Sequence, residues 1–448
     1  MKLTPALEAL KNIWRGDLYV VGGAVRDDIL GYAVTDVDLA SPLTPEEVVK
    51  LLAGTPFTVK KHSPRLGTLG ISGMNEKFEY TAFRSDSYPG TGGHAPSVVR
   101  FGVSLYEDAL RRDFTVNSVY FDLIRGEIVD PLGGVKDIEN RVLKTARAPE
   151  EVFNEDALRI MRLFRFAGKL GFSVDPALMR AAFEMRSGLD NIAPERIGAE
   201  LKGILLADAA NGIAGAHAKA FALMTDAGVT EKVLPEVARC RGVKQNPKWH
   251  LYDVYTHLFK TYEAIAPKLE LRLAAILHDI GKPVAGYTKG ATRTHPEFGA
   301  WLARERLAAL CFPQKTIDRV CMLIENHMFD LKGDASDVDE RIFVLEHADM
   351  IDDLVAVKNA DRLASGLRFD PSPAAQRLRE TMETMKKEGV AFTAKELKIT
   401  GEDTLSLPPE ERGYAIKALL RKNAWDPSVR NREGAKRFID DFPADVPK

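Results

Sequence analysis

The sequence predicts an α+β protein in which the first third combines a mixed sheet with helices and the rest is entirely helical. Up to about residue 145, short apolar runs rich in Val, Phe, Tyr and Thr are bounded by Gly, Asn or Asp, which is typical of β-strands. From about residue 150, apolar residues recur at three- and four-residue steps, which is typical of helices. A chain of 448 residues is too long for one hydrophobic core, so we expect roughly three or four domains.

Seven strand-like segments account for the expected sheet, and two helical stretches interrupt them. The strand-like segments are LYVVGG (18–23), TDVDLAS (35–41), FTVKKH (57–62), LGTLGIS (66–72), KFEYTAF (77–83), SVYFDL (118–123) and GEIVDPLGG (126–134). The helical stretches are AVRDDILG (24–31) and TPEEVVKLLAG (44–54). This alternation favours a mixed sheet with helices packed against it.

The second part of the sequence is helical almost throughout, with three breaks. The clearest helical runs are EDALRIMRLFRFAGKLG (155–171), PALMRAAFEMRS (176–187), IGAELKGILLA (197–207), KAFALMTDAG (219–228), LRLAAILHDIG (271–281) and TIDRVCMLIENHM (316–328). Proline- and glycine-containing breaks fall at 191–195, 241–249 and 369–375. We therefore expect four parts, which are a head (1–148), a helical neck (149–230), a helical body (231–368) and a helical tail (369–448).

Composition and charge exclude several classes of protein. The net charge is −2, with 62 Lys and Arg against 64 Asp and Glu, so a globally basic nucleic-acid-binding protein is excluded while a local basic groove is not. The three cysteines show no CxxC spacing and are too few for a disulfide framework, which fits a reducing compartment. The sequence has neither a signal-peptide core nor an apolar run of about 18 residues. We expect a cytoplasmic protein that makes no contact with membranes.

The first candidate site begins where an apolar strand ends in Gly22 and Gly23 and a helix carrying Arg26 follows. Paired glycines before a helix let backbone N–H groups approach a phosphate closely, and the N-terminus of the helix adds a favourable dipole. By itself such a turn is more often only a tight turn. We nevertheless interpret it as a phosphate-binding turn because two carboxylates follow shortly afterwards.

Asp36 and Asp38 lie two residues apart in an apolar stretch, so strand periodicity places both carboxylates on one face. Two adjacent carboxylates repel each other unless a cation lies between them, and two divalent ions bound there can serve hydroxyl attack on a triphosphate. We predict two Mg²⁺ ions held by Asp36 and Asp38. The alternative is a polar end of a strand. Glu79, which shares a strand face with Thr81, is a candidate third catalytic carboxylate or simply an exposed strand residue.

These features, taken in order, resemble the tRNA nucleotidyltransferase and poly(A) polymerase family. The matching stretches are GGAVRD and DVD (22–38), LRRDFTVNSVYFD (110–122), DPLGGVKDIENRVLKT (130–145), NEDALRIMRLFRFAGKLGF (154–172) and PERIGAELKGILL (194–206). The resemblance implies a polymerase-β-like nucleotidyltransferase head. The CCA-adding branch is the most similar, which implies template-independent addition of C and A from CTP and ATP to the 3′ end of tRNA with release of pyrophosphate.

The second motif, RRDFTVN, carries Arg112, Asp113 and Asn117. Asp113 and Asn117 are four residues apart and would share a helix face. The resemblance implies that these three residues hold the ribose of the incoming nucleotide. A surface turn with a helix-capping Asp is the alternative.

The neck motif carries Asp156, Arg159 and Arg162, and we expect the first two to be neighbours on one helix face. A carboxylate accepts from the exocyclic amino group of cytosine or adenine, and a guanidinium donates to the adjacent ring nitrogen. Uracil and guanine present the reverse order, and each mismatched buried polar group costs about 1–3 kcal/mol. The resemblance implies that this pair is the protein template that selects C and A. A surface ion pair is the alternative. Arg162 would contact base or phosphate.

A second candidate site consists of histidines and carboxylates in the body. Burying adjacent His and Asp at the end of an apolar helix is costly unless the pair binds something. The residues are His257, His278, Asp279, His295, His327 and Asp361. Imidazoles together with carboxylates suit a divalent metal such as Mn, Ni, Fe or Mg, and the lack of thiolates disfavours a structural zinc site. The six residues resemble the ligand pattern of the HD domain. Hydrolysis of phosphomonoesters or 2′,3′-cyclic phosphates is implied by the resemblance; a scaffold without activity is the alternative.

The tail is locally basic, and Lys417, Arg421 and Lys422 are candidate contacts to tRNA phosphates. A solvated helix face is the alternative.

For the whole chain, three rival interpretations stay open: a poly(A) polymerase, a partial enzyme that adds only CC or only A, and an HD phosphohydrolase whose head binds RNA. The 85–110 segment has the length usual in the family, which argues against CC-only addition, but HAP (94–96) stands where basic residues are common. The sequence does not address the oligomeric state.

Overall fold

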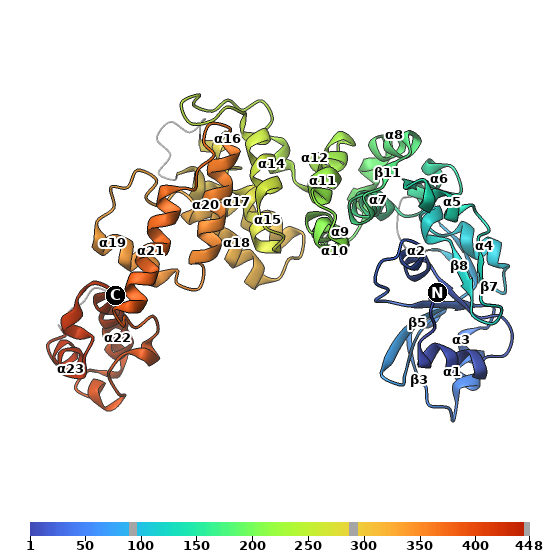
Figure 1. Cartoon of the computed structure of the whole chain (residues 1–448), viewed down its shortest axis with the longest axis horizontal. Coiled ribbons are helices and arrows are strands. Elements are labelled where there is room, and N and C mark those ends of the chain that lie inside the picture. Colours follow the sequence, from blue (N-terminus) through green and yellow to red (C-terminus); the bar gives the residue numbers. More distant parts are fainter. Residues whose placement is uncertain (89–95, 286–293, 443–448) are drawn as a thin grey trace. The chain divides into compact units, whose positions relative to one another are not determined.

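The computed structural model describes residues 1–88, 96–285 and 294–442. The chain divides into two compact units, one made of 1–238 with 309–312 and the other of 239–308 with 313–448. The first unit contains every strand among the described residues, and the second is helical. This arrangement confirms the predicted α+β class, and Figure 1 shows the sheet in the N-terminal part of the chain and helices in the rest. Among the described residues, no helix is long and apolar enough to cross a membrane.

The head contains a seven-stranded mixed sheet with the strand order β3-β4-β5-β2-β1-β8-β9. Its strands are β1 (Tyr19–Val21), β2 (Asp38–Ser41), β3 (Thr58–Ser63), β4 (Thr68–Gly73), β5 (Glu76–Ala82), β8 (Tyr120–Asp122) and β9 (Glu127–Val129). Only β2 and β5 run parallel; the other neighbours are antiparallel. Each of the seven strand-like segments of the sequence overlaps one of these strands.

Two further strand pairs and several helices of the head have no counterpart in the sequence expectations. They are the hairpin of β6 (Arg84–Ser87) with β7 (Val98–Phe101), the parallel pair β10 (Val142–Leu143) and β11 (Ser173–Val174), and the helices α1 (Pro5–Ile13), α4 (Leu105–Leu110) and α5 (Gly134–Glu139). β6 reads RSDS, which has no apolar alternation, so strand periodicity could not identify it. The predicted helices α2 (Gly23–Ile29) and α3 (Pro45–Leu52) are present.

Local capping signals explain where several head helices begin. The Thr44 side chain and Glu47 form a reciprocal capping box at the start of α3, and Ser104 and Glu107 do the same for α4. Beneath the sheet, buried Tyr19, Phe83 and Tyr120 pack against one another, with ring centroids 5.7–6.3 Å apart. This aromatic core fixes β1 and β8 side by side, and the turn after β1 and the segment before β8 carry several residues of the site described below.

The rest of the first unit is helical: α6 (Pro149–Glu155), α7 (Leu158–Leu170), α8 (Pro176–Met185), α9 (Pro194–Leu205), α10 (Ala207–Asn211), α11 (Ala216–Asp226), α12 (Thr230–Val233) and α13 (Pro235–Ala238). Helix α7 is central to this group because it packs against α9, α10 and α11. Gly168 permits that contact: a β-carbon there would lie 2.7 Å from the Ala207 β-carbon and 2.8 Å from that of Ala220.

The second unit consists of helices. They are α14 (Val254–Ala264), α15 (Leu269–Leu277), α16 (Lys282–Ala285), α17 (His295–Ala309), α18 (Gln314–Asn326), α19 (Asp337–Glu346), α20 (Ile351–Ala364), α21 (Pro373–Lys387), α22 (Pro409–Trp425) and α23 (Arg432–Asp440). The two predicted runs 271–281 and 316–328 overlap α15 and α18. The last two helices share a small apolar core that includes Ala415, Leu419, Val429 and Ile439. The tail therefore has its own buried cluster.

Candidate nucleotide site and metal centre

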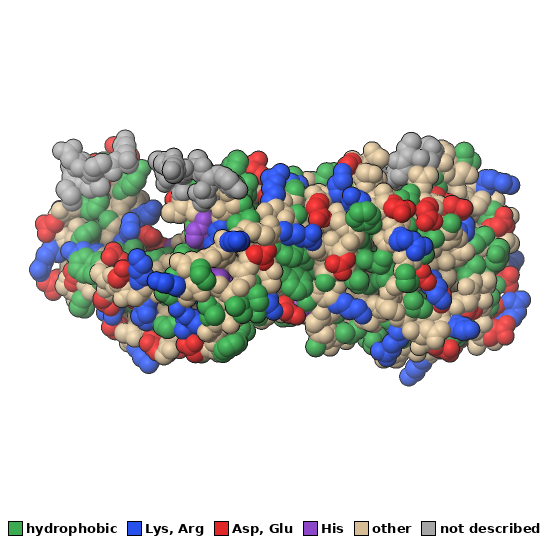
Figure 2. Space-filling view, turned by 90° about the horizontal axis from the view of Figure 1, so that it is seen from above, with side chains coloured by type: hydrophobic (Ala, Val, Ile, Leu, Met, Phe, Trp, Pro, Cys, Tyr) green, Lys and Arg blue, Asp and Glu red, His purple; other side chains and the backbone are tan. Residues whose placement is uncertain are grey.

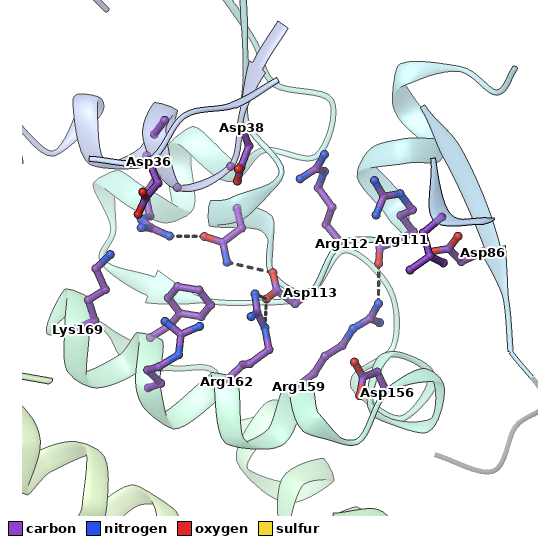
Figure 3. A pocket seen from close by; sticks show the side chains of 18 of the residues that line it. Asp36, Asp38, Asp86, Arg111, Arg112, Asp113, Asp156, Arg159, Arg162 and Lys169 are labelled. Carbon is purple, nitrogen blue, oxygen red and sulfur yellow. Dashed lines mark hydrogen bonds and ion pairs between the residues drawn. The ribbon is translucent and has the colours of Figure 1, made fainter. Parts of the chain in front are cut away.

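Asp36 and Asp38 both line a cavity of about 580 Å³ in the first unit. Figure 3 shows the two carboxylates pointing from the sheet side toward the space that side chains of α7, including Arg162 and Lys169, face from the opposite side. The expectation that both aspartates lie within one strand is wrong, because β2 begins at Asp38. Pairing with β1 and β5 starts at that residue, so Asp36 stands just outside the ladder while still lining the same cavity.

Glu79 is the direct neighbour of Asp38 across the parallel pair of β2 and β5, but it is not among the described residues that line the cavity. Burial raises the pKa of Asp38, and the nearby carboxylates of Glu79 and Asp36 raise it further, while the charge of Arg112 acts against them. Asp38 therefore has excess negative charge around it that a cation would neutralise.

The two aspartates fit a divalent cation by the chemistry of their donors. Hard divalent cations prefer oxygen ligands and are often held by one or two carboxylates together with substrate phosphates. Among the described residues, no set of three donor groups that includes Asp36 and Asp38 lies within 4.8 Å. A cation held here would thus depend on oxygens of the substrate as well as on these carboxylates.

Gly22 and Gly23 form the turn between β1 and α2. Gly22 has a φ of +76°, and a β-carbon there would lie 3.5 Å from the carbonyl oxygen of Asn117 and 3.8 Å from Nη1 of Arg112. Glycine at this position therefore gives both conformational freedom and close approach. Arg26, on the first turns of α2, is buried, and its guanidinium donates to Oδ1 of Asn117 and forms an ion pair with Asp27 at 2.6 Å.

Arg112 lines the cavity, and buried groups orient it. Its Nη2 lies 3.0 Å from Oδ2 of Asp108, and its Nε donates to the hydroxyl of Tyr120 at 3.1 Å. Asp108 is fully buried and also pairs with Arg111 at 2.8 Å. Burial alone would raise the pKa of Asp108, but Arg112 and Arg111 lower it to about 2. Asp108 is therefore a positioning residue that the sequence analysis did not identify.

Asp113 and Asn117 are joined by a hydrogen bond of 3.0 Å from Nδ2 of Asn117 to Oδ1 of Asp113. The expectation that they share the face of one helix is wrong, because α4 ends at Leu110 and only a 3₁₀ turn (Thr115–Asn117) follows. The other oxygen of Asp113 accepts from Nε of Arg162 at 2.8 Å. Burial would raise the pKa of Asp113, but Arg162 and Asn117 hold it well below its usual range.

Asp156 and Arg159 both line the cavity, but the expectation of two neighbours on one helix face is wrong. Asp156 has extended backbone (φ −147°, ψ 101°) at the break between α6 and α7, and its Oδ1 accepts from the backbone N–H of Leu158. Arg159 lies in α7 and is almost fully buried. The N-cap residue of α7 is Ala157, and Asp156, one residue before it, accepts from the first N–H of the helix.

Three acceptors hold the guanidinium of Arg159. Nη1 donates to the carbonyl of Val152 at 3.1 Å and to Oε2 of Glu155 at 2.8 Å, and Nη2 donates to the carbonyl of Arg111 at 2.7 Å. Figure 3 draws the contact to Arg111 and shows Asp156 beside Arg159. The carboxylate of Asp156 instead lies 3.6 Å from the guanidinium of Arg196 of α9. Among the described contacts, Asp156 and Arg159 form no ion pair with each other. Both side chains are thus oriented by other partners.

Several residues that line the cavity were missed by the sequence analysis. Phe166 is buried beneath three guanidinium groups, those of Arg26, Arg162 and Arg165, at 4.3–5.3 Å from its ring centroid. Tyr88, Arg84, Asp86, Lys169 and Arg196 also line the cavity. The neck motif contains Phe166 and Lys169, so their helical spacing from Arg162 was an available signal. Tyr88 directly precedes residues 89–95, and His94 and Ala95 of the HAP segment lie outside the described residues.

The second unit brings together all six histidines and aspartates predicted for the body. Nε2 of His257 lies 2.9 Å from Oδ1 of Asp361 and 3.2 Å from Nε2 of His278. Asp279 completes the centre. Its carboxylate lies 3.3 Å from His278, 3.4 Å from His295 and 3.8 Å from His327. We call these six residues the His/Asp cluster.

The His/Asp cluster fits a metal ion by its donors and by its unsatisfied atoms. Three overlapping sets of three ligand atoms lie within 4.8 Å of one another. Oδ1 of Asp279 and Nε2 of His295 are buried without a hydrogen-bond partner, which is costly unless something binds them. Nδ1 of His278 and Nδ1 of His327 face the carbonyls of Ala275 and Ile324, at 2.9 and 2.6 Å, which leaves Nε2 of each ring for a ligand.

Charges within the cluster also favour a bound cation. Burial, with the neighbouring His278, lowers the pKa of His327 to about 3, so this ring is neutral and able to coordinate. Burial would raise the pKa of Asp279, yet the neighbouring His278 and Lys282 hold it well below its usual range, so the carboxylate is ionised. The neutral ring of His327 and the ionised carboxylate of Asp279 are donors that divalent transition metals accept.

The tail residues predicted to contact tRNA lie on α22. Lys417 and Arg421 are exposed, and Arg421 forms an ion pair with Glu346 at 3.2 Å. Lys422 is half-buried and lies over the rings of Trp425 and Phe438, at 5.9 and 5.3 Å from their centroids. Lys417 thus presents its charge to solvent, whereas Lys422 is engaged with its own helix pair.

Comparisons with known families assign the main parts of the chain. The family described as "Poly A polymerase head domain" matches residues 18–144, and "Probable RNA and SrmB- binding site of polymerase A" matches residues 171–240. The family described as "HD domain" matches residues 250–366, which include the whole His/Asp cluster. Nucleotidyltransferase heads and HD domains both imply dependence on divalent metal ions.

Curated relatives match less than half of the chain. A CCA-adding enzyme of Streptococcus pneumoniae is 40% identical over 206 residues, which is 46% of this chain and 50% of that protein. One of Geobacillus is 39% identical over 189 residues, or 42% of this chain and 45% of that protein. The chain therefore spans about half the length of the curated relatives it matches.

Solved structures match nearly the whole fold at low identity. The CCA-adding enzyme of Bacillus stearothermophilus in complex with CTP has a TM-score of 0.69 at 23% identity and covers 98% of this chain and 97% of that one. The CCA-adding enzyme of Thermotoga maritima complexed with tRNA has a TM-score of 0.57 at 17% identity, with 98% and 95% covered. The chain thus carries a region that matches the poly(A) polymerase head family and a region that matches the HD domain family, and its fold is similar to that of these solved CCA-adding enzymes.

Proposed function

We propose that the protein is a CCA-adding tRNA nucleotidyltransferase, which transfers C and A from CTP and ATP to the 3′ end of tRNA and releases pyrophosphate. The observation that supports this most is that Asp36 and Asp38 line the same cavity as Asp156 and Arg159. One cavity thus combines carboxylates for the chemistry with a donor and an acceptor for reading a base. A tRNA substrate also makes the cytoplasm the expected location.

Asp36 and Asp38, with Glu79 next to Asp38, are proposed to hold two Mg²⁺ ions. When bound, these ions would lower the pKa of the attacking tRNA hydroxyl and neutralise charge on the triphosphate. The chain itself positions the reactants: Gly22 admits close approach of the backbone to phosphate, and Arg112, fixed by Asp108, directs positive charge into the cavity. Positioning and charge neutralisation are sufficient for this reaction class, so no covalent intermediate is expected.

Asp156 and Arg159 are proposed to select the base. The contacts of Arg159 to Val152, Glu155 and Arg111 hold its guanidinium in one orientation and leave Nε–H available to a ligand. Asp156 keeps an oxygen that faces Arg196 at 3.6 Å. A fixed donor beside a fixed acceptor matches the Watson–Crick edge of C and A and mismatches U and G. Arg112, Asp113 and Asn117 are proposed to hold the ribose, with Arg26 and Arg162 supporting them.

The test is incorporation of labelled CTP and ATP into tRNA whose 3′ end has been trimmed. We expect addition of C, C and A, loss of incorporation in Asp36→Ala, and loss of base preference in Arg159→Ala while Mg²⁺ dependence stays unchanged. Equal addition of all four nucleotides by the unmodified chain would refute the template. ATP-only extension of many RNAs would favour a poly(A) polymerase, and a product of only CC or only A would favour a partial enzyme.

The tail is proposed to contact tRNA phosphates through Lys417, Arg421 and Lys422. Because each phosphate contact releases counterions, replacing Lys417 by Gln should weaken tRNA binding and reduce the salt dependence by about one phosphate contact. Lys422→Gln should have a smaller effect, because its ammonium group already lies over Trp425 and Phe438. An unchanged salt slope in Lys417→Gln would place the tRNA elsewhere.

A second function is proposed for the His/Asp cluster, which is metal-dependent hydrolysis of phosphate esters. Mn, Ni, Fe or Mg bound there would activate water. The unsatisfied Asp279 and His295 atoms and the basic cavity in front of the cluster favour it. Hydrolysis that is lost in His278→Ala would support this function. Hydrolysis without any nucleotide incorporation would instead favour an HD phosphohydrolase whose head only binds RNA.

A further inference from the structure

We infer that Arg196 of α9 is a positioning residue for base selection, because its guanidinium orients the carboxylate of Asp156. The inference rests on the function proposed for the first unit, in which Asp156 accepts from the exocyclic amino group of cytosine or adenine. Arg196 would act on the base only through Asp156. The bases concerned are those that carry an amino group beside a ring nitrogen.

Arg196 combines a place in the nucleotide cavity with a contact to Asp156. It lies in the first turn of α9 and lines the cavity, and its Nη2 lies 3.6 Å from Oδ2 of Asp156. This distance is within the range of an ion pair and longer than a charge-assisted hydrogen bond of about 2.7–2.9 Å. Contacts in active sites often shorten when substrate binds. A small movement would therefore bring the two groups into a direct hydrogen bond.

The two oxygens of Asp156 have different partners. Oδ1 accepts from the backbone N–H of Leu158 at 3.1 Å, which ties it to the start of α7. In the described part of the chain, Arg196 is the only residue that forms an ion pair with Asp156. Each carboxylate oxygen has two acceptor sites, so Oδ2 can accept from Arg196 and from the amino group of a base at the same time. Arg196 would thus set the direction of the oxygen that reads the base.

Two other arginines of this region have their acceptors elsewhere. The Nη atoms of Arg159 share three acceptors, and the two Nη atoms of Arg147 donate to the carboxylate of Glu155 at 2.7 and 2.6 Å. Nη1 of Arg196, by contrast, is buried without a hydrogen-bond partner. A buried donor without a partner is costly. Hydrogen bonds within the fold therefore do not explain why an arginine stands at this position.

The position is also unfavourable for the helix that carries Arg196. A cation in the first turn of a helix faces the positive end of the helix dipole, which disfavours it. Arg196 is the third residue of α9, which begins at Pro194. Pairing with Asp156 gives a reason for an arginine here that the stability of α9 does not. A solvated arginine without a role is the alternative, since 35% of the side chain is exposed.

The charge that acts on Asp156 is local. The whole chain has a net charge of −2, and acidic and basic side chains are interspersed over the face shown in Figure 2. Exposed charges more than about 10 Å apart are largely screened by salt. The side chain of Asp156 is 15% exposed, so its ion pair with Arg196 is only partly screened. This pair therefore has more influence on Asp156 than the distant surface charges have.

The test compares two ligands that differ in one group, ATP and purine riboside 5′-triphosphate, which lacks the exocyclic amino group. Their affinities for the full chain are measured by calorimetry in the presence of Mg²⁺. The variants are Arg196→Met, Arg196→Lys, Asp156→Ala and the combination of Arg196→Met with Asp156→Ala. Arg180→Met is the matched control, because Arg180 is exposed on α8 and does not line the cavity.

We expect the unmodified chain to bind ATP about tenfold more tightly than the analogue, and Arg196→Met to bind ATP about fivefold more weakly than the unmodified chain does. The affinity for the analogue should change less than about twofold, because the analogue offers Asp156 no amino group. Arg196→Lys should retain part of the preference for ATP, since the positive charge is kept, and Arg180→Met should retain all of it. When Asp156 is already alanine, Arg196→Met should have no further effect.

Three results would overturn the inference: an equal loss for both ligands in Arg196→Met, an unchanged preference for ATP in that variant, or a further loss when Asp156 is already alanine. A different result would count against the proposed function. If the unmodified chain binds neither ligand, or both equally, the base selection proposed for Asp156 is refuted, and the role of Arg196 with it.

Discussion

At the scale of single residues, the surroundings of Asp38 disfavour the ionised form of its carboxylate. Burial and the carboxylates of Glu79 and Asp36 raise its pKa above the ordinary aspartate value. A raised pKa in the folded state means that the ionised group destabilises the fold at neutral pH. The charge of Asp38 therefore does not stabilise the fold, which agrees with the metal-binding role proposed for this residue.

We predict that Asp38→Asn lowers nucleotide incorporation at least about a hundredfold, because one of the two carboxylates proposed to hold the metal ions is lost. Its melting temperature should equal or exceed that of the unmodified chain, since repulsion with Glu79 is removed. Single-turnover incorporation and calorimetry measure the two effects. Asp17→Asn, at a half-exposed carboxylate of the same unit, should change neither. A marked fall in melting temperature would contradict the electrostatic argument.

Asp108 shows the opposite behaviour, because two arginines and Tyr120 stabilise its ionised form. Its pKa in the folded chain is about 2, against an ordinary value of 3.8. A lowered pKa contributes stability that is present above the unfolded value and lost as the pH falls toward the folded one. The difference corresponds to about 2 kcal/mol.

We predict that the stability gap between the unmodified chain and Asp108→Asn shrinks by about 2 kcal/mol as the pH is lowered from 5 to 2. Urea unfolding of the first unit at a series of pH values measures it. Asp190→Asn, at an exposed carboxylate of that unit, is the matched control and should show a small gap at every pH. A gap for Asp108→Asn that does not change with pH would exclude the ion pairs with Arg111 and Arg112 as its cause.

At the scale of elements, helix α7 connects the chemistry to the packing of the neck. One of its faces carries Arg159 and Arg162 toward the cavity, and Gly168 lies where α10 and α11 approach most closely. Glycine in a helix costs about 1 kcal/mol relative to alanine, so its presence there needs a packing reason. The contacts of 2.7 and 2.8 Å that a β-carbon would make to Ala207 and Ala220 supply that reason.

We predict that Gly168→Ala destabilises the first unit by about 1–3 kcal/mol through overpacking. Gly413→Ala is the matched control, because Gly413 lies inside α22 and a β-carbon there meets nothing within 4 Å. That control should stabilise the chain by about 0.5–1 kcal/mol. Chemical unfolding measures both variants. Stabilisation by both substitutions would show that α7 can move away from its neighbours at no cost.

At the scale of the whole molecule, the second unit depends on contacts between distant helices. The His/Asp cluster joins residues from α14, α17 and α20 with the residues that end α15 and α18. A metal ion held there would link five helices. Because the unfolded chain does not bring these residues together, metal binding stabilises the folded unit by mass action.

We predict that Ni²⁺ or Mn²⁺ at about one hundred times its dissociation constant stabilises the second unit by about 2–3 kcal/mol. Calorimetry should show this as a rise of a few degrees in melting temperature. Asp361→Asn should abolish the rise. His347→Gln, at a histidine of the same unit outside the cluster, should keep it. An equal rise in both variants would indicate metal bound elsewhere on the chain.

Sequence alone predicted the α+β class, segments that overlap all seven strands of the head sheet, and many of the residues that line the candidate nucleotide cavity, although Phe166 and Tyr88 were missed. These features depend on local patterns, because burial on one face imposes a period of two on strands and about 3.6 on helices. The same periods misled at Asp36, Asp113 and Asp156. Each of these aspartates lies just outside a helix or strand. Periodicity describes residues inside regular elements, so it cannot show the conformation or the contacts of residues beyond their ends.

Tertiary structure alone decided which partners each site residue has. Arg26 meets Asn117, 91 residues away, Phe166 lies under three arginines, and Trp249 shares a cavity with the His/Asp cluster. No local pattern encodes these contacts, because they depend on how strands pair and helices cross over long separations. The sequence thus determines which residue types are present for the chemistry, whereas the packing of the folded chain determines the orientation and charge of each group.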